Sequence, residues 1–349
     1  MTKLKEKESP IYIYGPVPSR RLGFSLGIDI LPFKTCSLDC IYCQLGPTPK
    51  KTVERKKYFA TDSVIAQIKR ALSSGQRIDY ITFSGSGEPT LNADLGTLIR
   101  EIKTITDIPV AVLTNSTLLT DEEVRKELSA ADLVVPSLDA ATQDVFIEVN
   151  RPPASLKTED IIAGLKKFRK EFKGQIWLEI MLVAGINDSP EHIEKLKAAV
   201  REIEPDRIQL NTVIRPPAEA HAKALSIEEL EKIQKTLGKK CAIIADFHRL
   251  DQFPQQKNLE EKILSMIHRR PVTLSDISAS LGKHRDEVLK YLNILSRKNR
   301  IRSVIHKEKT YYEPAGPAIE HNEQDGKKLK KKTKRLKPDT QYKEQKSVT

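Results

Sequence analysis

The chain has 349 residues and a net charge of +12, and 39% of its residues are hydrophobic. That length predicts two domains, one of them large enough for an α/β barrel. No apolar run approaches the roughly 18 residues of a membrane span, and the charged first ten residues predict no signal peptide. We therefore expect a cytoplasmic protein with no membrane partner.

The positive charge is concentrated toward the C-terminus. Residues 1–256 sum to about +1, whereas residues 257–349 sum to about +11. Within that excess, residues 327–337 hold eight basic side chains in eleven. We therefore expect the C-terminal part of the chain to be the one that meets an anionic polymer.

The chain begins with a proline- and glycine-rich lead-in. Its composition predicts an irregular segment over residues 11–24, lying above the mouth of a barrel. Arg20 and Arg21 within it either form a solvated basic turn or bind an anion. An apolar stretch at residues 25–31 then predicts the first strand of the barrel.

Strand and helix patterns alternate after that point. Apolar periodicity predicts helices at 61–74, 92–105, 121–130, 158–172 and 189–203, the first capped by Thr61 or Asp62. Strands are predicted at 78–83, 109–113, 132–138, 175–183 and 207–212. Six such units indicate an α/β fold built on a partial (β/α)6 barrel. A helix at 226–237 and an edge strand at 241–247 follow, with Cys241 as a buried small hydrophobe.

The pattern becomes short and helical beyond residue 253. Helices are predicted at 258–268, at 273–282 with a capping box from Thr273 to Asp276, and at 284–299. Two strands at 301–305 and 310–313 complete an order that resembles a winged helix-turn-helix module. The polar tail cannot bury a core and is expected to be disordered. The predicted parts are therefore a barrel (1–250), a winged helix (251–315) and a disordered basic tail (316–349).

Basic side chains on or beside the last helix and in the wing are candidate nucleic-acid contacts, with a solvated surface as the alternative. They are Lys283, Arg285, Lys290, Arg297, Lys298, Arg300, Arg302, Lys307 and Lys309.

Three cysteines lie close together just after the first predicted strand. Cys36, Cys40 and Cys43 have the spacing CxxxCxxC, so their thiolates can converge on one metal centre. Closed zinc sites need four nitrogen or sulfur ligands, and 4Fe-4S clusters usually take four thiolates. The first histidine is His192, so the loop offers no fourth ligand of this kind. A structural zinc site and a disulfide are the disfavoured alternatives.

The sequence SGSGEPT at residues 84–90 follows the second predicted strand. Its glycines let the backbone approach a ligand closely, and exposed carbonyls beside a carboxylate can bind an ammonium group. Polar residues at later strand ends are expected to point into the barrel mouth, or else to form turns and caps. These are Asn115, Ser116, Ser137, Asp139, Asn150, Asn211 and Arg215.

The cysteine spacing, with Tyr42 before the last cysteine, resembles the signature of the radical S-adenosylmethionine superfamily. The resemblance implies a 4Fe-4S cluster held by Cys36, Cys40 and Cys43, with S-adenosylmethionine on the open iron. The SGSGEPT turn resembles the family's GGEP element, which binds the amino group of the methionine moiety. The cofactor-binding residues that the resemblance implies are Tyr42, Gly87, Glu88, Pro89, Asn115 and Ser137, the last two as ribose contacts.

The resemblance also implies a reaction. A reduced cluster passes one electron to the sulfonium, and the resulting 5′-deoxyadenosyl radical abstracts hydrogen from a substrate. A one-electron donor such as flavodoxin or ferredoxin is an expected partner. Nucleic acid, RNA more than DNA, is expected to bind the C-terminal domain and tail.

Residues 11–250 look like the branch that contains wyosine tRNA-base synthases, because the lead-in and the Gln44, Leu45 and Gly46 end of the cysteine loop match it. The synthases carry a second cysteine triplet, which this chain lacks. Three functions therefore stay open: a radical enzyme for RNA, such as one that modifies tRNA; a radical enzyme for a protein or small molecule; and a redox-sensing, DNA-binding regulator.

Overall fold

The computed structural model describes residues 12–19, 21–214, 217–245, 259–260, 263–264, 266–267, 272–281, 283–306 and 309–315. The predictions for Arg20, Arg215, Gly282, Lys307, the boundary near residue 250 and the tail 316–349 fall outside these residues. None of the helices in the described ranges is long and apolar enough to cross a bilayer.

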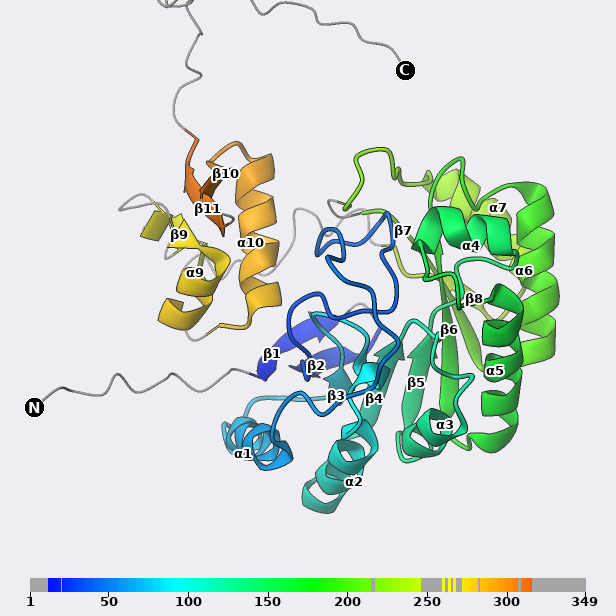
Figure 1. Cartoon of the computed structure of the whole chain (residues 1–349), viewed down its shortest axis with the longest axis horizontal. Coiled ribbons are helices and arrows are strands. Elements are labelled where there is room, and N and C mark those ends of the chain that lie inside the picture. Colours follow the sequence, from blue (N-terminus) through cyan, green and yellow to red (C-terminus); the bar gives the residue numbers. More distant parts are fainter. Residues whose placement is uncertain are drawn as a thin grey trace, which may run out of the picture.

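Within the described ranges, the larger part of the chain forms an eight-stranded sheet whose strands follow chain order (Figure 1). Neighbouring strands from β2 onward are parallel, whereas β1 is antiparallel to β2. The strands are β1 (Ile13–Ser19), β2 (Gly23–Ile28), β3 (Tyr80–Phe83), β4 (Val110–Thr114), β5 (Leu133–Pro136), β6 (Gln175–Leu182), β7 (Arg207–Thr212) and β8 (Cys241–Ile243).

Helices connect the parallel strands and lie along the outer side of the curved sheet in Figure 1. They are α1 (Thr61–Leu72), α2 (Leu95–Ile105), α3 (Glu122–Leu128), α4 (Gln143–Asn150), α5 (Thr158–Glu171), α6 (Pro190–Ile203) and α7 (Ile227–Leu237). This arrangement confirms an α/β fold with a mainly parallel sheet and a partial barrel. The short helix α4 was not predicted.

The apolar patterns that predicted these elements form the core. The consecutive residues Ile81, Thr82 and Phe83 of β3 are all buried, as expected for a parallel strand covered on both sides. On α1 the buried positions are Val64, Ile65 and Ile68, which share one face at helical spacing. The buried stripe of each outer helix therefore packs on the sheet, and the strand ends remain available for the site.

Two local predictions were wrong. The lead-in is a strand, β1, because it pairs with β2 from Ile13 opposite Ile28 to Ser19 opposite Gly23. As an edge strand with a register shift, β1 accommodates Pro16 and Pro18, which a central strand would not. The N-cap of α1 is Ala60, without a side-chain hydrogen bond, rather than Thr61 or Asp62.

The C-terminal part has its own core, formed around Ile277, Val288, Leu292 and Leu295. Helices α9 (Leu274–Leu281) and α10 (Arg285–Arg297) pack with a three-stranded antiparallel sheet. Its strands are β9 (Val272–Thr273), β10 (Ile301–His306) and β11 (Lys309–Pro314), and β9 was not predicted. We call residues 272–315 the C-terminal unit; its identity as a winged helix stays a prediction.

The predicted capping box is present at the start of α9. The Thr273 backbone N–H donates to the Asp276 carboxylate at 2.8 Å, and the Asp276 N–H donates to the Thr273 hydroxyl at 3.1 Å. This reciprocal pair satisfies backbone donors at the helix start, so the helix begins where the sequence placed it.

Candidate functional site

The two predicted motifs lie against each other at the carboxyl ends of β2 and β3. The Lys34 N–H donates to the Ser86 carbonyl at 2.7 Å, and the Glu88 N–H donates to the Thr35 carbonyl at 3.0 Å. A Cβ on Gly87 would lie 1.9 Å from the Thr35 carbonyl oxygen. Only glycine therefore fits at position 87, and the turn is joined directly to the segment that leads into Cys36.

The Glu88 side chain is buried and points to protein donors. One carboxylate oxygen, Oε1, accepts the Thr90 N–H at 3.1 Å and the Thr90 and Thr114 hydroxyls, each at 2.6 Å. The other, Oε2, accepts the Asn115 N–H at 2.6 Å. Burial raises the pKa of Glu88, and these hydrogen bonds oppose that shift. Glu88 therefore holds the turn to the end of β4 (Val110–Thr114).

Each cysteine sulfur of the loop has a nitrogen donor from another position in the chain. The Asn115 amide lies 3.6 Å from Cys36 Sγ, and the Asn150 amide lies 3.2 Å from Cys40 Sγ. Lys34 Nζ lies 2.9 Å from Cys43 Sγ. Hydrogen bonds to the sulfurs are one of the features that set the reduction potential of iron–sulfur clusters.

The donor set fits a cluster better than a single zinc ion. Sulfur ligands of one tetrahedral zinc lie about 4 Å from one another, since each Zn–S bond is about 2.3 Å. Among the described residues, the three cysteine sulfurs do not form a group with all ligand atoms within 4.8 Å of one another. The three sulfurs are therefore not arranged as ligands of one tetrahedral zinc ion, and the thiols are only partly buried.

Burial favours the neutral form of two of the bare thiols, Cys36 and Cys40. Burial, with a smaller effect of the Glu88 charge, raises the pKa of Cys36 to about 11, and burial also raises the pKa of Cys40. A metal centre would reverse this preference, because metal ligation requires the thiolate.

Tyr42 connects the cysteine loop to the carboxyl end of β5. Its hydroxyl donates to Asp139 Oδ2 at 2.5 Å, and the Asn150 amide donates to the same oxygen at 2.8 Å. The Met181 N–H donates to Asp139 Oδ1 at 2.9 Å. Burial raises the pKa values of both Asp139 and Tyr42, and the Asp139 charge raises that of Tyr42 further.

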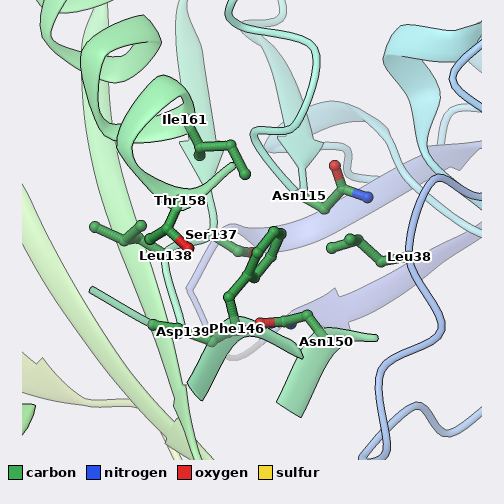
Figure 2. Close-up of a pocket in the computed structure, with 10 residues that line it drawn as sticks. Leu38, Asn115, Ser137, Leu138, Asp139, Phe146, Asn150, Thr158 and Ile161 are labelled. Atoms are coloured by element: carbon green, nitrogen blue, oxygen red, sulfur yellow. Dashed lines mark hydrogen bonds between the residues drawn. The ribbon is translucent and has the colours of Figure 1, made fainter. Parts of the chain in front are cut away.

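A small cleft opens beside this network. Figure 2 shows the Phe146 ring pointing into the space between Asn115 and Thr158. The other residues that line the cleft are Leu38, Ser137, Leu138, Asp139, Ala140, Asn150 and Ile161. The cleft thus brings together Asn115 and Ser137.

Two further predicted site residues, Arg21 and Asn211, bind the side chain of Glu179 in the barrel. Arg21 donates to Glu179 at 2.6 Å and to Gln209 at 2.9 Å, and its side chain is 12% exposed. The Asn211 amide donates to the other Glu179 oxygen at 2.9 Å. Arg21 therefore binds an anion of the protein itself rather than forming a solvated turn.

Several of the basic side chains proposed for nucleic acid contact the protein itself. Lys283 pairs with Glu287 at 3.3 Å, and Arg302 pairs with Glu313 at 2.7 Å. Lys298 lies 3.4 Å from Glu260, and the Arg285 guanidinium lies over the Phe33 ring at 4.9 Å. Arg297, Arg300 and Lys309 are exposed.

Sequence reasoning missed the hydrogen-bonding roles of Lys34, Thr90 and Thr114. Lys34 is buried and has a left-handed backbone conformation, with φ of 60°. Its position two residues before Cys36 was the available signal, but lysine gives no indication of a sulfur contact. Thr114 gave no local signal, because its partner Glu88 follows a neighbouring strand. Thr90 lies only two residues after Glu88, so the signal for this contact was local and was overlooked.

The Tyr42 hydroxyl is predicted to stabilise the fold of the loop. Tyr42→Phe removes one donor from a buried carboxylate and should lower the free energy of unfolding by about 1–3 kcal/mol. Urea denaturation measures this change, with Tyr58→Phe as the matched control on a half-buried ring. An unchanged urea midpoint for Tyr42→Phe would show that the bond to Asp139 contributes nothing.

Comparisons with known proteins agree with this site. The family model of the radical SAM superfamily matches residues 30–196. The chain is 42% identical to the GTPase Obg of Brachyspira hyodysenteriae over 87% of this chain, but it spans only 45% of that protein. The dual-specificity RNA methyltransferase RlmN of Nitratidesulfovibrio vulgaris is 28% identical over 53% of this chain and 51% of its own length.

A relative of similar length defines the family more closely. The UPF0026 protein of Methanocaldococcus jannaschii is 36% identical, and the match covers 77% of this chain and 86% of that protein. The chain therefore belongs to the UPF0026 family, and its residues 30–196 match the radical SAM superfamily.

Proposed function

We propose that this protein is a radical S-adenosylmethionine enzyme whose Cys36, Cys40 and Cys43 hold a 4Fe-4S cluster. The observation that carries the proposal is the direct joining of the cysteine loop to the turn at residues 84–90 by two backbone hydrogen bonds. A cluster site alone would not need that turn. When bound, the cluster supplies the electron that cleaves S-adenosylmethionine to methionine and a 5′-deoxyadenosyl radical.

The residues of the chain have separate parts in this proposal. Carbonyls of the turn bind the ammonium group of the methionine moiety, and Glu88 holds those carbonyls in place. Asn115 and Ser137 line the cleft and bind the ribose hydroxyls. Phe146 and Leu38 provide apolar surface that excludes water and other hydrogen donors from the reacting carbon.

We propose RNA as the first substrate class to test, with tRNA modification as one form of the reaction. Two features support it: the charge of about +11 over residues 257–349, and the similarity to a relative described as an RNA methyltransferase. The exposed Arg297, Arg300 and Lys309 are the described side chains best placed for phosphate contacts. A flavodoxin or ferredoxin is the proposed electron donor.

One observation favours a protein or small-molecule substrate as the second candidate. The start of α10 lies against the barrel, where the His284 side chain is 4% exposed and Arg285 stacks on Phe33. In helix-turn-helix proteins the N-terminal residues of the second helix contact the base edges. With that end covered, a DNA-reading regulator is the least favoured of the three functions.

The test is anaerobic incubation of the reconstituted full chain with dithionite and S-adenosylmethionine, followed by chromatography. We expect 5′-deoxyadenosine and methionine in equal amounts, with a higher yield when the RNA substrate is added. Transfer RNA and duplex DNA of equal charge serve as the two polyanions. Stimulation by transfer RNA alone supports the RNA proposal, and cleavage that neither polyanion changes favours the second candidate. Cofactor binding without any deoxyadenosine would contradict the enzyme proposal.

A further inference from the structure

His284 lies at the contact between the C-terminal unit and the barrel. It is the N-cap of α10, and its Nδ1 accepts the Asp286 N–H at 3.3 Å. Because Nδ1 is an acceptor in this bond, the neutral ring carries its proton on Nε2. Nε2 lies 3.2 Å from Asp29 Oδ2, which makes this N–H a donor to a carboxylate of the barrel.

Asp29 is bound on its other side to the SGSGEPT turn. The same oxygen, Oδ2, accepts the Ser86 N–H at 3.0 Å and also the Ser86 hydroxyl. A Cβ on Gly85 would lie 2.6 Å from the Asp29 carboxylate carbon, so the turn approaches this side chain as closely as a glycine permits. The Asp29 and His284 side chains are 6% and 4% exposed, so bulk water does not compete strongly for their contact.

A second contact runs from His284 to the other side of the same turn. The Tyr14 ring lies 4.4 Å from the His284 ring, centre to centre, and the Tyr14 hydroxyl lies 2.7 Å from the Ser84 hydroxyl. A Cβ on Gly27 would overlap the Tyr14 ring, which fixes the position of that ring over β2. His284 therefore contacts two of the side chains that hold the turn: Asp29, which is bonded to Ser86, and Tyr14, which is bonded to Ser84.

We infer that His284 is a positioning residue for the cofactor site: it acts through Asp29 and Tyr14 to hold the turn at residues 84–88. The inference rests on the proposed function, because it assigns the held turn to S-adenosylmethionine. It makes the C-terminal unit a part of the cofactor site. Helix α10, which was predicted to contact a polyanion, is then joined to the turn through the His284 side chain.

Three buried ligand-type side chains meet here, since atoms of Asp29, His284 and Asp286 all lie within 4.8 Å of one another. The hydrogen bonds explain this cluster without a metal ion. Nδ1 of His284 is used for capping and Nε2 for the bond to Asp29, whose Oδ2 already accepts two bonds from Ser86. Both histidine nitrogens therefore have protein partners.

The test uses five full-chain variants, among them Asp29→Ala alone, and two measurements. His284→Ala removes the donor, and His284→Gln replaces it with an amide N–H at similar reach. Asp29→Ala combined with His284→Ala completes a double-mutant cycle. Arg302→Ala is the control, because it breaks an exposed pair with Glu313 elsewhere in the C-terminal unit.

The first measurement is hydrogen exchange of the turn in the metal-free protein. The Ser86 N–H donates to Asp29, so its exchange reports on the turn without any cofactor. We expect exchange of the peptide at residues 84–91 to be about fivefold faster or more in His284→Ala, since local opening becomes easier. His284→Gln should restore most of the protection, and Arg302→Ala should leave it unchanged.

The second measurement is equilibrium dialysis of S-adenosylmethionine with the reconstituted protein. His284→Ala should raise Kd about tenfold with its iron content retained, in line with the loss of one hydrogen bond to a charged group. In the Asp29→Ala background the same change should have little further effect.

The outcomes separate this inference from the proposed function. If exchange of the turn is faster in His284→Ala but the wild-type protein binds no S-adenosylmethionine, the contact stands and the proposed function is refuted. Normal cofactor binding and unchanged exchange in His284→Ala would refute the inference alone. If Asp29→Ala does not fold, exchange and rescue in the His284 variants still decide the question. A lowered melting temperature without faster exchange of the turn would show a structural contact only.

Discussion

Replacing Cys40 with alanine is expected to abolish the iron–sulfur cluster and with it all formation of 5′-deoxyadenosine. The same result is expected for Cys36→Ala and Cys43→Ala, because the loop supplies three thiols and each sulfur has its own N–H donor. Anaerobic reconstitution of the wild type should give about four irons per chain. Iron analysis and the visible absorption of the cluster measure the change.

The matched control is Cys241→Ala. Cys241 is also a cysteine of the barrel, but it lies in β8 with 6% exposure and packs in the main core. Burial raises the pKa of its thiol to about 12, as burial also raises the pKa values of Cys36 and Cys40, so its place in the core rather than its pKa distinguishes Cys241. Loss of the cluster in Cys241→Ala, with retention in Cys40→Ala, would overturn the ligand assignment.

Glu88→Ala is expected to abolish tight binding of S-adenosylmethionine while the cysteines still bind iron. The substitution leaves the Thr90, Thr114 and Asn115 donors without their acceptor in a buried position. Unsatisfied buried donors should lower the free energy of unfolding by about 3 kcal/mol and let the turn move. Kd for the cofactor should rise at least about 100-fold, which corresponds to about 2.7 kcal/mol of binding free energy. Equilibrium dialysis and urea denaturation measure the two effects.

Two further variants make this result specific. Glu88→Gln keeps the size but turns an N–H₂ group toward one of the donors, so an intermediate effect is expected. Asp206→Ala removes a carboxylate that accepts the Ile176 N–H at 2.7 Å at the amino ends of the strands. It should lower stability without changing cofactor affinity. Equal affinities for Glu88→Ala and the wild type would show that the turn does not bind the cofactor.

The strand ends that carry the site could be predicted because parallel topology brings them to one edge. The cysteine loop and the glycine turn follow neighbouring strands, so their contact was expected once those strands were identified. Ser137 and Asn115 were placed in one cleft by the same rule. Apolar periodicity was sufficient for the outer helices, because each buries one face on the sheet.

The residues that were missed depend on partners far away in the chain. β1 has no alternating pattern and becomes a strand only because β2 offers an edge. His284 meets Asp29 across some 255 positions, and neither residue has a local pattern that indicates the pair. Glu88 was expected to face a ligand, but its four hydrogen bonds come from donors that sequence reasoning had not assigned to it.

Electron paramagnetic resonance tests most directly whether the cysteine loop and the turn form one cofactor site. The reconstituted protein is reduced with dithionite and titrated with S-adenosylmethionine, for the wild type and for Glu88→Ala. We predict a signal typical of a reduced 4Fe-4S cluster in both proteins. In the wild type the signal should shift as the cofactor is added, and in Glu88→Ala the shift should require far higher concentrations. A wild-type signal that stays unchanged at saturating S-adenosylmethionine would contradict the account, because the cluster and the cofactor would then occupy separate sites.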